Sequence, residues 1–342
     1  MTFERLTPCL FTLILLGCAE PQPSRGPAVD ESIRVMSGRT MGTVWSARFV
    51  PRSRQAGTPA IRAMVSQKLT ELEAQMSTWR SNSVISRFNL STDTNWFAIP
   101  NEMLTVVQAG QEVAAKTGGA FDITVLPLVE LWGFGPGQKT PTTMGIEQIE
   151  EAKRSVGMEL LEVRVTPPAI RKRVPNLQID LSAIAKGYAV DEVAKLLDGY
   201  KLTQYLVEIG GELKARGVSP KGRPWRVGIE RPEPGKIKVV AAVELKDQAI
   251  ATSGDYRNIR ELGGRSYSHI INPRTGRPRA LRSTAVSVIH DSCMIADAWA
   301  TALTVLDFSE AIRFSEAAGV SCQVIIQIDG ELTIRPNSLW GL

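Results

Sequence analysis

The chain has 342 residues, of which 43% are hydrophobic and 22% charged, a composition typical of one large or two ordinary globular domains. Its net charge of +5 suits an anionic ligand or a membrane surface. No run of lysine and arginine is long enough, or sufficiently interleaved with aromatic residues, to indicate nucleic-acid binding. The composition therefore favours a globular protein and argues against a nucleic-acid-binding one.

The first residues are typical of a targeting segment, not of a folded domain. A weakly basic start is followed by an apolar stretch that ends in Leu-Leu-Gly-Cys at positions 15–18, which resembles a bacterial lipobox. The stretch is too short to span a membrane as a mature helix. We therefore expect residues 1–17 to be a lipoprotein signal peptide that is cleaved before Cys18, whose thiol and amine are then acylated. An ordinary signal peptide is the alternative.

Residues 18–32 are rich in Pro, Ser and Gly, so we expect them to form a tether between the lipidated Cys18 and a folded domain over 33–342. After cleavage and lipidation, Cys293 and Cys322 are the remaining cysteines. An oxidising compartment would permit a disulfide between them, but two cysteines make no disulfide framework, and we expect two buried free thiols.

The first part of the folded domain shows strand-like and helix-like patterns. Residues 35–49 alternate as a strand does, with an interruption at 41–42. Amphipathic helices are predicted over 60–76 and 103–117. Between these helices a polar loop holds Trp79, and an aromatic residue in such a loop is more often a packing anchor than a ligand platform.

A weak internal repeat occupies the second half of the chain. An amphipathic helix over 189–197 precedes an apolar strand over 205–209, and a helix over 309–318 precedes a strand over 324–328. Each strand is followed by Gly-Glu-Leu, which indicates a turn into a second strand. The repeat therefore predicts an α+β fold with a duplicated core and largely antiparallel pairing.

The stretch from Asp180 to Asp191 reads DLSAIAKGYAVD. Residues 177–181 look like the end of a strand and residues 188–197 have helical spacing, so the segment between them lies at a predicted strand-to-helix junction. Such a junction presents free backbone groups and a positive helix end to anions. The alternative is that Lys186 is simply solvated and Asp180 forms a turn.

Residues 293–306 form a predicted apolar helix, capped by Asp291 or Ser292, that carries Asp297 and Thr301 on one face. A carboxylate on a buried helix is costly unless it is paired or binds a metal. Oxygen ligands of this kind suit Mg²⁺. Pairing of the aspartate with an arginine, and bonding of the threonine to its own helix, is the alternative.

Histidine is scarce, which argues against an imidazole-rich zinc site. His269, near the end of a predicted strand, is either a general base or a structural residue. The turn at 251–258 could give hydroxyls and backbone amides to a phosphate, or be an ordinary Asx-type turn. Four arginines between 274 and 282 form a solvated loop or attract phosphates. Together these features predict a metal-assisted reaction on a phosphate-containing aromatic ligand.

These segments, in this order, resemble the ApbE family of FAD:protein FMN transferases, formerly called thiamine biosynthesis lipoproteins. The resemblance runs from about Met36 to Leu306. It rests on eight blocks, which are far more specific together than singly: MGTVWSARF, MSTWRSNSVISRFN, GGAFDITVLPLVELWGFGP, DLSAIAKGYAVD, LVEIGGELKARG, AIATSGDYRN, SHIINPRTG and ADAWATAL.

The resemblance implies an α+β, T-fold-like architecture with FAD in a cleft. It implies Mg²⁺ bound by Asp297, Thr301 and the carbonyl of Ala183, with His269 as the catalytic base. Trp79 falls where many family members have an aromatic residue that stacks on the isoalloxazine, which reverses the packing interpretation. The positions that match FAD contacts are Met41, Trp79, Ala120, Phe121, Asp122, Asp180, Lys186, Ser253 and Ile271.

The resemblance also implies a reaction: FMN passes from FAD to a Thr or Ser hydroxyl of an acceptor protein, and AMP is released. Family acceptors carry an Asp three residues before the modified residue and belong to sodium-translocating NADH:quinone reductase, Rnf-type complexes or other exported redox proteins. With the lipobox, this places the protein in the bacterial cell envelope, lipid-anchored and facing the periplasm. The alternatives are a Mg²⁺-dependent FAD hydrolase that yields FMN and AMP, and a non-catalytic FAD-binding lipoprotein.

Overall fold

The computed structural model describes residues 33–51, 57–137, 145–233, 238–262, 264–281, 283–328 and 331–341. These residues all lie in one compact unit. The predicted signal peptide, the tether and Cys18 lie outside the described residues. Among the residues described, none of the helices combines the length and the hydropathy that crossing a membrane requires.

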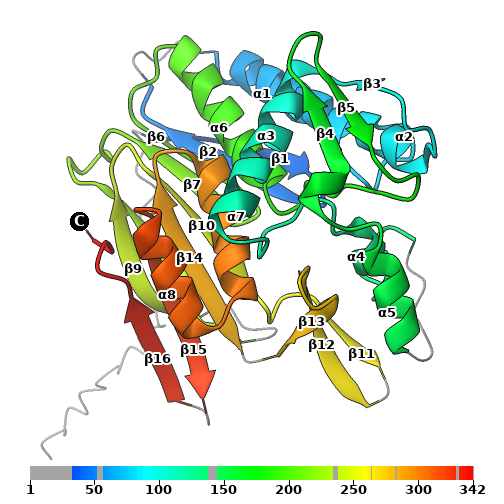
Figure 1. The fold of residues 1–342 in the computed structure, drawn as a ribbon. Coiled ribbons are helices and arrows are strands. Elements are labelled where there is room, and N and C mark those ends of the chain that lie inside the picture. Colours follow the sequence, from blue (N-terminus) through cyan, green and yellow to red (C-terminus); the bar gives the residue numbers. More distant parts are fainter. Residues whose placement is uncertain are drawn as a thin grey trace, which may run out of the picture. The chain divides into compact units, whose positions relative to one another are not determined.

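An eight-stranded antiparallel sheet forms the centre of the described chain (Figure 1). Its strand order is β1-β2-β6-β7-β10-β14-β15-β16. The bounds are β1 (Arg34–Thr40), β2 (Thr43–Phe49), β6 (Tyr205–Ile209), β7 (Glu212–Arg216), β10 (Ala249–Gly254), β14 (Thr284–His290), β15 (Ser321–Ile328) and β16 (Glu331–Pro336).

The predicted single strand over 35–49 is wrong, because β1 and β2 form a hairpin there. Met41 and Gly42 both have positive φ, 47° and 71°, which is the conformation that a two-residue hairpin turn of the favoured hand requires. The interruption of the alternation at these positions is therefore the turn itself.

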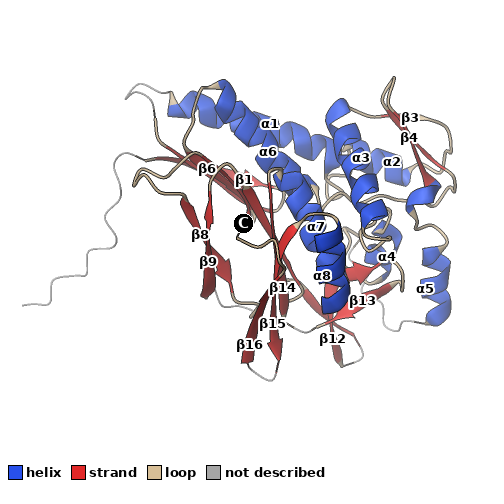
Figure 2. Cartoon of the chain, turned by 60° about the vertical axis from the view of Figure 1, so that its left-hand side comes forward, coloured by secondary structure: helices blue, strands red, loops and turns tan. Residues whose placement is uncertain are grey.

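Helices cover one face of the central sheet, as Figures 1 and 2 show. Along the chain they are α1 (Thr58–Met76), α3 (Asn101–Lys116), α6 (Ala185–Gly199), α7 (Cys293–Val305) and α8 (Phe308–Ala317). Helix α6 contacts β6 and β7, α7 contacts β10 and β14, and α8 contacts β15. The predicted helices are confirmed, and α1 buries the apolar stripe Ile61, Val65, Leu69, Leu72 and Met76.

A hairpin of β8 (Trp225–Glu230) and β9 (Val239–Leu245) lies on the opposite face of the sheet. Trp225, Val227 and Ile229 point from β8 into a core shared with Leu206 and Ile250 of the central sheet. The alternating burial along β8 follows from the two-residue period of a strand. The central strands are thus buried on both faces where this hairpin covers them.

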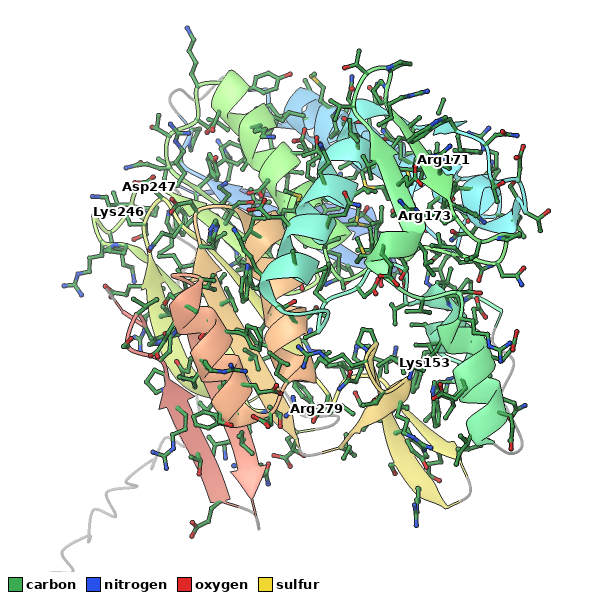
Figure 3. All side chains as sticks on the ribbon, in the orientation of Figure 1. Lys153, Arg171, Arg173, Lys246, Asp247 and Arg279 are labelled. Carbon is green, nitrogen blue, oxygen red and sulfur yellow. The ribbon has the colours of Figure 1, made fainter. Side chains whose placement is uncertain are left out.

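The remaining elements form two small sheets and short helices around the core. One sheet has the order β3-β5-β4; Arg171 lies on β5, and Arg173 follows that strand directly (Figure 3). The other has the order β11-β12-β13. Their bounds are β3 (Phe97–Ala98), β4 (Leu161–Arg164), β5 (Ala169–Lys172), β11 (Ile259–Leu262), β12 (Arg265–Asn272) and β13 (Arg277–Ala280). The short helices are α2 (Val84–Leu90), α4 (Leu126–Leu131), α5 (Ile146–Lys153) and a 3₁₀ turn (Met158–Leu160).

The duplicated core is present as predicted. Helix α6 leads into the antiparallel hairpin β6–β7, and α8 leads into the antiparallel hairpin β15–β16. Both hairpins belong to the central sheet. Cys293 and Cys322 are free and buried, which agrees with the expectation of two buried thiols.

The predicted strand over 177–181 is wrong. The segment is buried and extended, but its backbone bonds to a side chain in place of a neighbouring strand: Asn89 accepts from the N–H of Ile179 at 2.8 Å and donates to its carbonyl at 2.8 Å. The next N–H, of Asp180, donates to the carbonyl of Ile123 at 2.7 Å. An alternating segment thus looks like a strand in sequence, although the backbone groups of Ile179 at its centre bond to an asparagine side chain.

Asp191, the last residue of the DLSAIAKGYAVD stretch, joins α6 to α7. Its carboxylate accepts from the N–H groups of Cys293 (3.1 Å) and Met294 (3.0 Å), and from the hydroxyl of Ser292 (2.7 Å). The ammonium of Lys214 lies 2.7 Å away. Asp191 therefore caps a helix that is distant in sequence, in addition to the cap that Ser292 provides.

We expect Asp191→Ala to lower the free energy of unfolding by about 2–3 kcal/mol, because several donors at the start of α7 lose a buried acceptor. Urea denaturation would measure the loss. Glu112→Ala is the matched control, since Glu112 is exposed and its ion pair with Lys116 on α3 should contribute at most about 0.5 kcal/mol. Equal stability of the two variants would contradict a capping role for Asp191.

Candidate active site

A cavity of about 360 Å³ lies where the first turn of α6, the middle of α7 and strands β7, β10 and β12 meet. Twelve of the residues predicted from the sequence line it: Trp79, Ala120, Phe121, Asp122, Asp180, Ala183, Lys186, Ser253, His269, Ile271, Asp297 and Thr301. Segments far apart in the chain therefore converge on one site.

Met41 is the predicted FAD contact in the described chain that does not line the cavity. Its N–H donates to the carboxylate of Glu73 at 2.6 Å, and Glu73 lies 3.5 Å from the guanidinium of Arg80. Arg80 follows Trp79 directly. The hairpin turn at Met41 is thus tied through Glu73 to the loop that carries Trp79, and its contact with FAD stays a prediction.

Asp297 and Thr301 face the cavity from α7, as their spacing predicts. Asp297 is 2% exposed and accepts from the N–H of Gly187 at 3.0 Å. Its nearest cation is Lys186, at 4.0 Å, in place of the arginine considered from the sequence. The hydroxyl of Thr301 lies 3.0 Å from that of Ser253 on β10. Burial raises the pKa of Asp297, against the opposing charge of Lys186 and the bond from Gly187.

The predicted metal ligands fit a hard cation. They supply a carboxylate, a hydroxyl and a backbone carbonyl, all oxygen donors of the type that Mg²⁺ prefers. The N–H of Gly187 donates to Asp297. Among the described residues this N–H makes no hydrogen bond to the carbonyl of Ala183, so that oxygen is available to bind a cation. The same residues hold no cluster of three or more His, Cys, Asp or Glu side chains that could bind a metal ion.

Glu212 is a site residue that the sequence analysis missed. This carboxylate at the start of β7 is 3% exposed and lies 2.6 Å from the ammonium of Lys186. Its other oxygen has no hydrogen-bond partner among the described residues. Burial raises the pKa of Glu212, and Lys186 opposes the rise. The available signal was the Gly-Glu-Leu that follows each strand of the repeat, which indicates a turn and by itself does not mark the glutamate as a site residue.

Lys186 lies between two buried carboxylates, which fixes its charge. Burial by itself lowers the pKa of this lysine, but Asp297 and Glu212 outweigh burial and raise it above its ordinary value. The side chain is 30% exposed and lines the cavity. Lys186 is therefore a permanent cation at the N-terminal turn of α6, where the helix end also favours anions.

His269 reaches the cavity from β12. Its Nδ1 is buried and has no partner among the described residues, and the ring of Phe134 lies 6.5 Å away in an edge-on arrangement. Burial lowers the pKa of His269, and the positive charges of Lys186 and Arg257 lower it further. The imidazole is thus held neutral near pH 7, the form that a general base needs.

The opposite side of the cavity is aromatic and acidic. Trp79 is 61% exposed, so its ring faces solvent at the cavity and is free to stack on a planar ligand. Asp122 accepts from the N–H and hydroxyl of Thr124 at 2.7 and 2.6 Å. Asp180 accepts from the N–H of Ser182 at 2.8 Å. Burial raises the pKa of both carboxyl groups.

Other lining residues were not predicted as ligand contacts. Phe134 and its neighbours at 135–136 come from the end of the GGAFDITVLPLVELWGFGP block, and Arg257 and Asn258 follow β10. Conversely, the arginines after His269 do not line the cavity in the described chain. Arg274 donates to the carbonyls of Thr117 and Gly118, and Arg279 donates to that of Thr304. Position 282 lies outside the described residues.

Gly187 sets the distance between α6 and α7. A methyl group at this position would collide with the carbonyl oxygen of Cys293 and lie 2.8 Å from Cβ of Asp297. We therefore expect Gly187→Ala to push Lys186 and Asp297 apart and to reduce activity about 100-fold, as misplacement by about 1 Å can. Gly199→Ala at the end of the same helix, where nothing lies within 4 Å, is the control. Comparable activity of both variants would show that this close approach is dispensable.

A cavity that combines buried carboxylates, a lysine, a neutral histidine and an exposed tryptophan is typical of an enzyme that acts on a phosphorylated aromatic substrate. The model of the ApbE family matches residues 41–326, and this chain belongs to that family.

Known relatives align with this chain over nearly their whole length. The chain is 38% identical over 317 residues to a FAD:protein FMN transferase of Vibrio cholerae serotype O1, covering 93% of this chain and 92% of the relative. It is 36% identical over 333 residues to a FAD:protein FMN transferase of Klebsiella pneumoniae, covering 97% and 94%. The solved structure of the flavin transferase ApbE from Vibrio cholerae superposes with a TM-score of 0.81 at 37% identity, covering 90% of this chain and 98% of that one.

Proposed function

We propose that this protein transfers FMN from FAD to a Thr or Ser hydroxyl of an acceptor protein, with Mg²⁺ as cofactor and AMP as the leaving group. Membership of the ApbE family makes the chain an FAD:protein FMN transferase, like the relatives named above. The observation that carries the proposed chemistry is the meeting of His269, Lys186 and Asp297 in one cavity with Trp79.

The proposed step is a phosphoryl transfer in which the protein positions charges and moves one proton. The acceptor oxygen forms a bond to the FMN-side phosphorus of FAD, and the bond from that phosphorus to the bridging oxygen of the pyrophosphate breaks. His269 takes the hydroxyl proton, and the electron pair of the broken bond leaves with AMP. Because the imidazole is held neutral, it can accept this proton near pH 7.

Lys186 would stabilise the negative charge on the pyrophosphate, since its two carboxylate neighbours keep it protonated. Asp297, Thr301 and the carbonyl of Ala183 would hold Mg²⁺, which supplies further charge neutralisation at the phosphates when bound. Trp79 would stack on the isoalloxazine. Asp122 and Asp180, both lining the cavity, would accept hydrogen bonds from the flavin side of the substrate.

We also propose the location and partners that the sequence indicates. Residues 1–17 would be removed as a signal peptide, and lipidated Cys18 would anchor the domain through residues 18–32 to a membrane facing the periplasm. Acceptors would be exported redox proteins, among them subunits of NADH:quinone reductase or Rnf-type complexes. Labelling of the chain with a radioactive fatty acid, and its loss in Cys18→Ala, would test the anchor.

The deciding experiment mixes the full-length chain with FAD, Mg²⁺ and a soluble acceptor domain that carries an Asp-x-x-Thr motif. Fluorescence on the acceptor in a denaturing gel, with one AMP released per flavin attached, is the expected result. An acceptor whose threonine is replaced by alanine is the control. Free FMN without labelled acceptor would indicate a hydrolase, and unchanged FAD would indicate a binding protein.

A further inference from the structure

A second cavity, of about 230 Å³, lies on the opposite side of the central sheet from the helices. Residues 226–230 of β8 form one wall. The other wall comes from β2, β6, β7 and β10, through Arg48, Glu208, Leu213 and Ile250 among others. Nothing in the proposed chemistry uses this cavity.

The two cavities meet at a split in the sheet. Strands β7 and β10 pair only at Lys214 with Ala249 and at Leu213 with Ile250, whereas β10 continues along β14 as far as Gly254. Thr252, beyond the last pair, lines both cavities, as does Arg257. The second cavity therefore opens toward the catalytic one without crossing the helical layer.

The wall formed by β8 presents a free strand edge. In the described chain β8 pairs with β9 alone, and residues of β8 line the cavity whereas none of β9 does. The N–H and C=O groups on the unpaired edge of such a strand can bind an extended peptide as an added strand.

The charged side chains that line the cavity near this edge have a net positive charge. Arg48 and Arg226 are exposed, and neither has a hydrogen bond or ion pair within the ranges that the structure describes. Arg257 lies 3.1 Å from Glu230, so one of the two glutamates lining the cavity is already paired. Three arginines against two glutamates leave a site that favours a carboxylate-bearing ligand.

From these observations we infer that the second cavity binds an extended, carboxylate-bearing segment of the acceptor protein, which pairs with the free edge of β8 and enters the catalytic cavity past Thr252 and Arg257. The inference rests on the proposed function for the identity of the ligand. It adds the surface that selects the acceptor, which is separate from the surface that holds FAD.

The test measures binding of the acceptor domain separately from the transfer of FMN. A fluorescein-labelled soluble acceptor domain with an Asp-x-x-Thr motif is titrated with the full-length chain in the absence of FAD, and its anisotropy gives the Kd. We expect the double variant Arg48→Gln/Arg226→Gln to raise this Kd about tenfold, because two charge-assisted contacts are lost. Lys246→Gln is the matched control: Lys246 is exposed at the turn after β9 (Figure 3) and does not line the cavity.

Two further readouts make the result specific. Hydrogen exchange of the backbone amides of residues 226–230 should slow when the acceptor domain binds, while that of α5 should not change. The affinity for FAD, read from flavin fluorescence, should be equal in the wild type and the double variant.

The inference is overturned if the acceptor domain binds the wild type and the double variant equally, if it does not bind the wild type, or if the double variant loses FAD affinity in proportion. A wild type that binds the acceptor domain through this cavity but does not flavinylate it would instead refute the proposed function and leave the docking surface standing.

Discussion

Replacement of Asp297 by asparagine should reduce covalent flavinylation by about 10³-fold or more while the protein stays folded. The carboxylate is the one charged member of the predicted Mg²⁺ site, and a metal of this kind contributes several kcal/mol to a phosphoryl-transfer transition state, where each 1.4 kcal/mol is about a factor of ten in rate. Asparagine keeps the size of the side chain and retains an oxygen that can accept from the N–H of Gly187. The measurement is the initial rate of acceptor labelling at several Mg²⁺ concentrations.

The control for this variant is Asp247→Asn. Asp247 also accepts a backbone N–H, from Gly217 at 2.8 Å, but it is exposed on the turn between β9 and β10, so its rate should equal that of the wild type. A thermal melt checks that Asp297→Asn is folded. Wild-type labelling by Asp297→Asn, or an unchanged dependence on Mg²⁺, would remove Asp297 from the metal site.

The elements that could be predicted from sequence are those whose signal is local. Helix α1 was found because five apolar residues recur on one stripe, and all five are buried. The helix-and-hairpin repeat was visible because each copy carries its own turn. Asp297 and Thr301 were found because a carboxylate on an apolar helix is conspicuous. In each case the residues that decide the structure are within a few positions of one another.

The parts that sequence could not predict depend on residues that are distant in the chain. Nothing near residues 177–181 reveals that Asn89 satisfies the backbone there. Glu212 reads as a turn residue until β7 places it against Lys186. The role of Asp191 as a cap for α7 requires the packing of two helices whose sequences are about a hundred residues apart. The predicted roles in FAD binding came from the family resemblance, not from local patterns.

The DLSAIAKGYAVD stretch illustrates how one segment serves several parts of the site. Asp180 lines the cavity, Lys186 lies between Asp297 and Glu212, and Asp191 fixes the start of α7. Gly187 between them lets α6 approach α7 closely and gives its N–H to Asp297. The stretch therefore orients α7, which carries the predicted metal ligands, against the residues that would hold the phosphates.

His269→Ala should lower the rate of flavinylation about 10²- to 10⁴-fold, the usual contribution of a general base, and should leave FAD binding nearly unchanged.

The flavinylation rate of the wild type should fall as the pH is lowered. The base works only when neutral, and burial together with Lys186 and Arg257 lowers its pKa from 6.5. Activity should therefore persist at pH 6.5 and fall only as the pH drops through that lowered pKa.

Two comparisons separate catalysis by His269 from a structural role. The residual activity of His269→Ala should lack the acidic limb of the pH profile, because the base whose protonation produces that limb has been removed. His290→Asn, a change at the other histidine of the chain, keeps an acceptor for the N–H of Ser292 that His290 now binds at 2.9 Å, so its rate and profile should match the wild type. An acidic limb that survives in His269→Ala would assign the proton transfer to a different group, for which Glu212, buried and lining the same cavity, is a candidate.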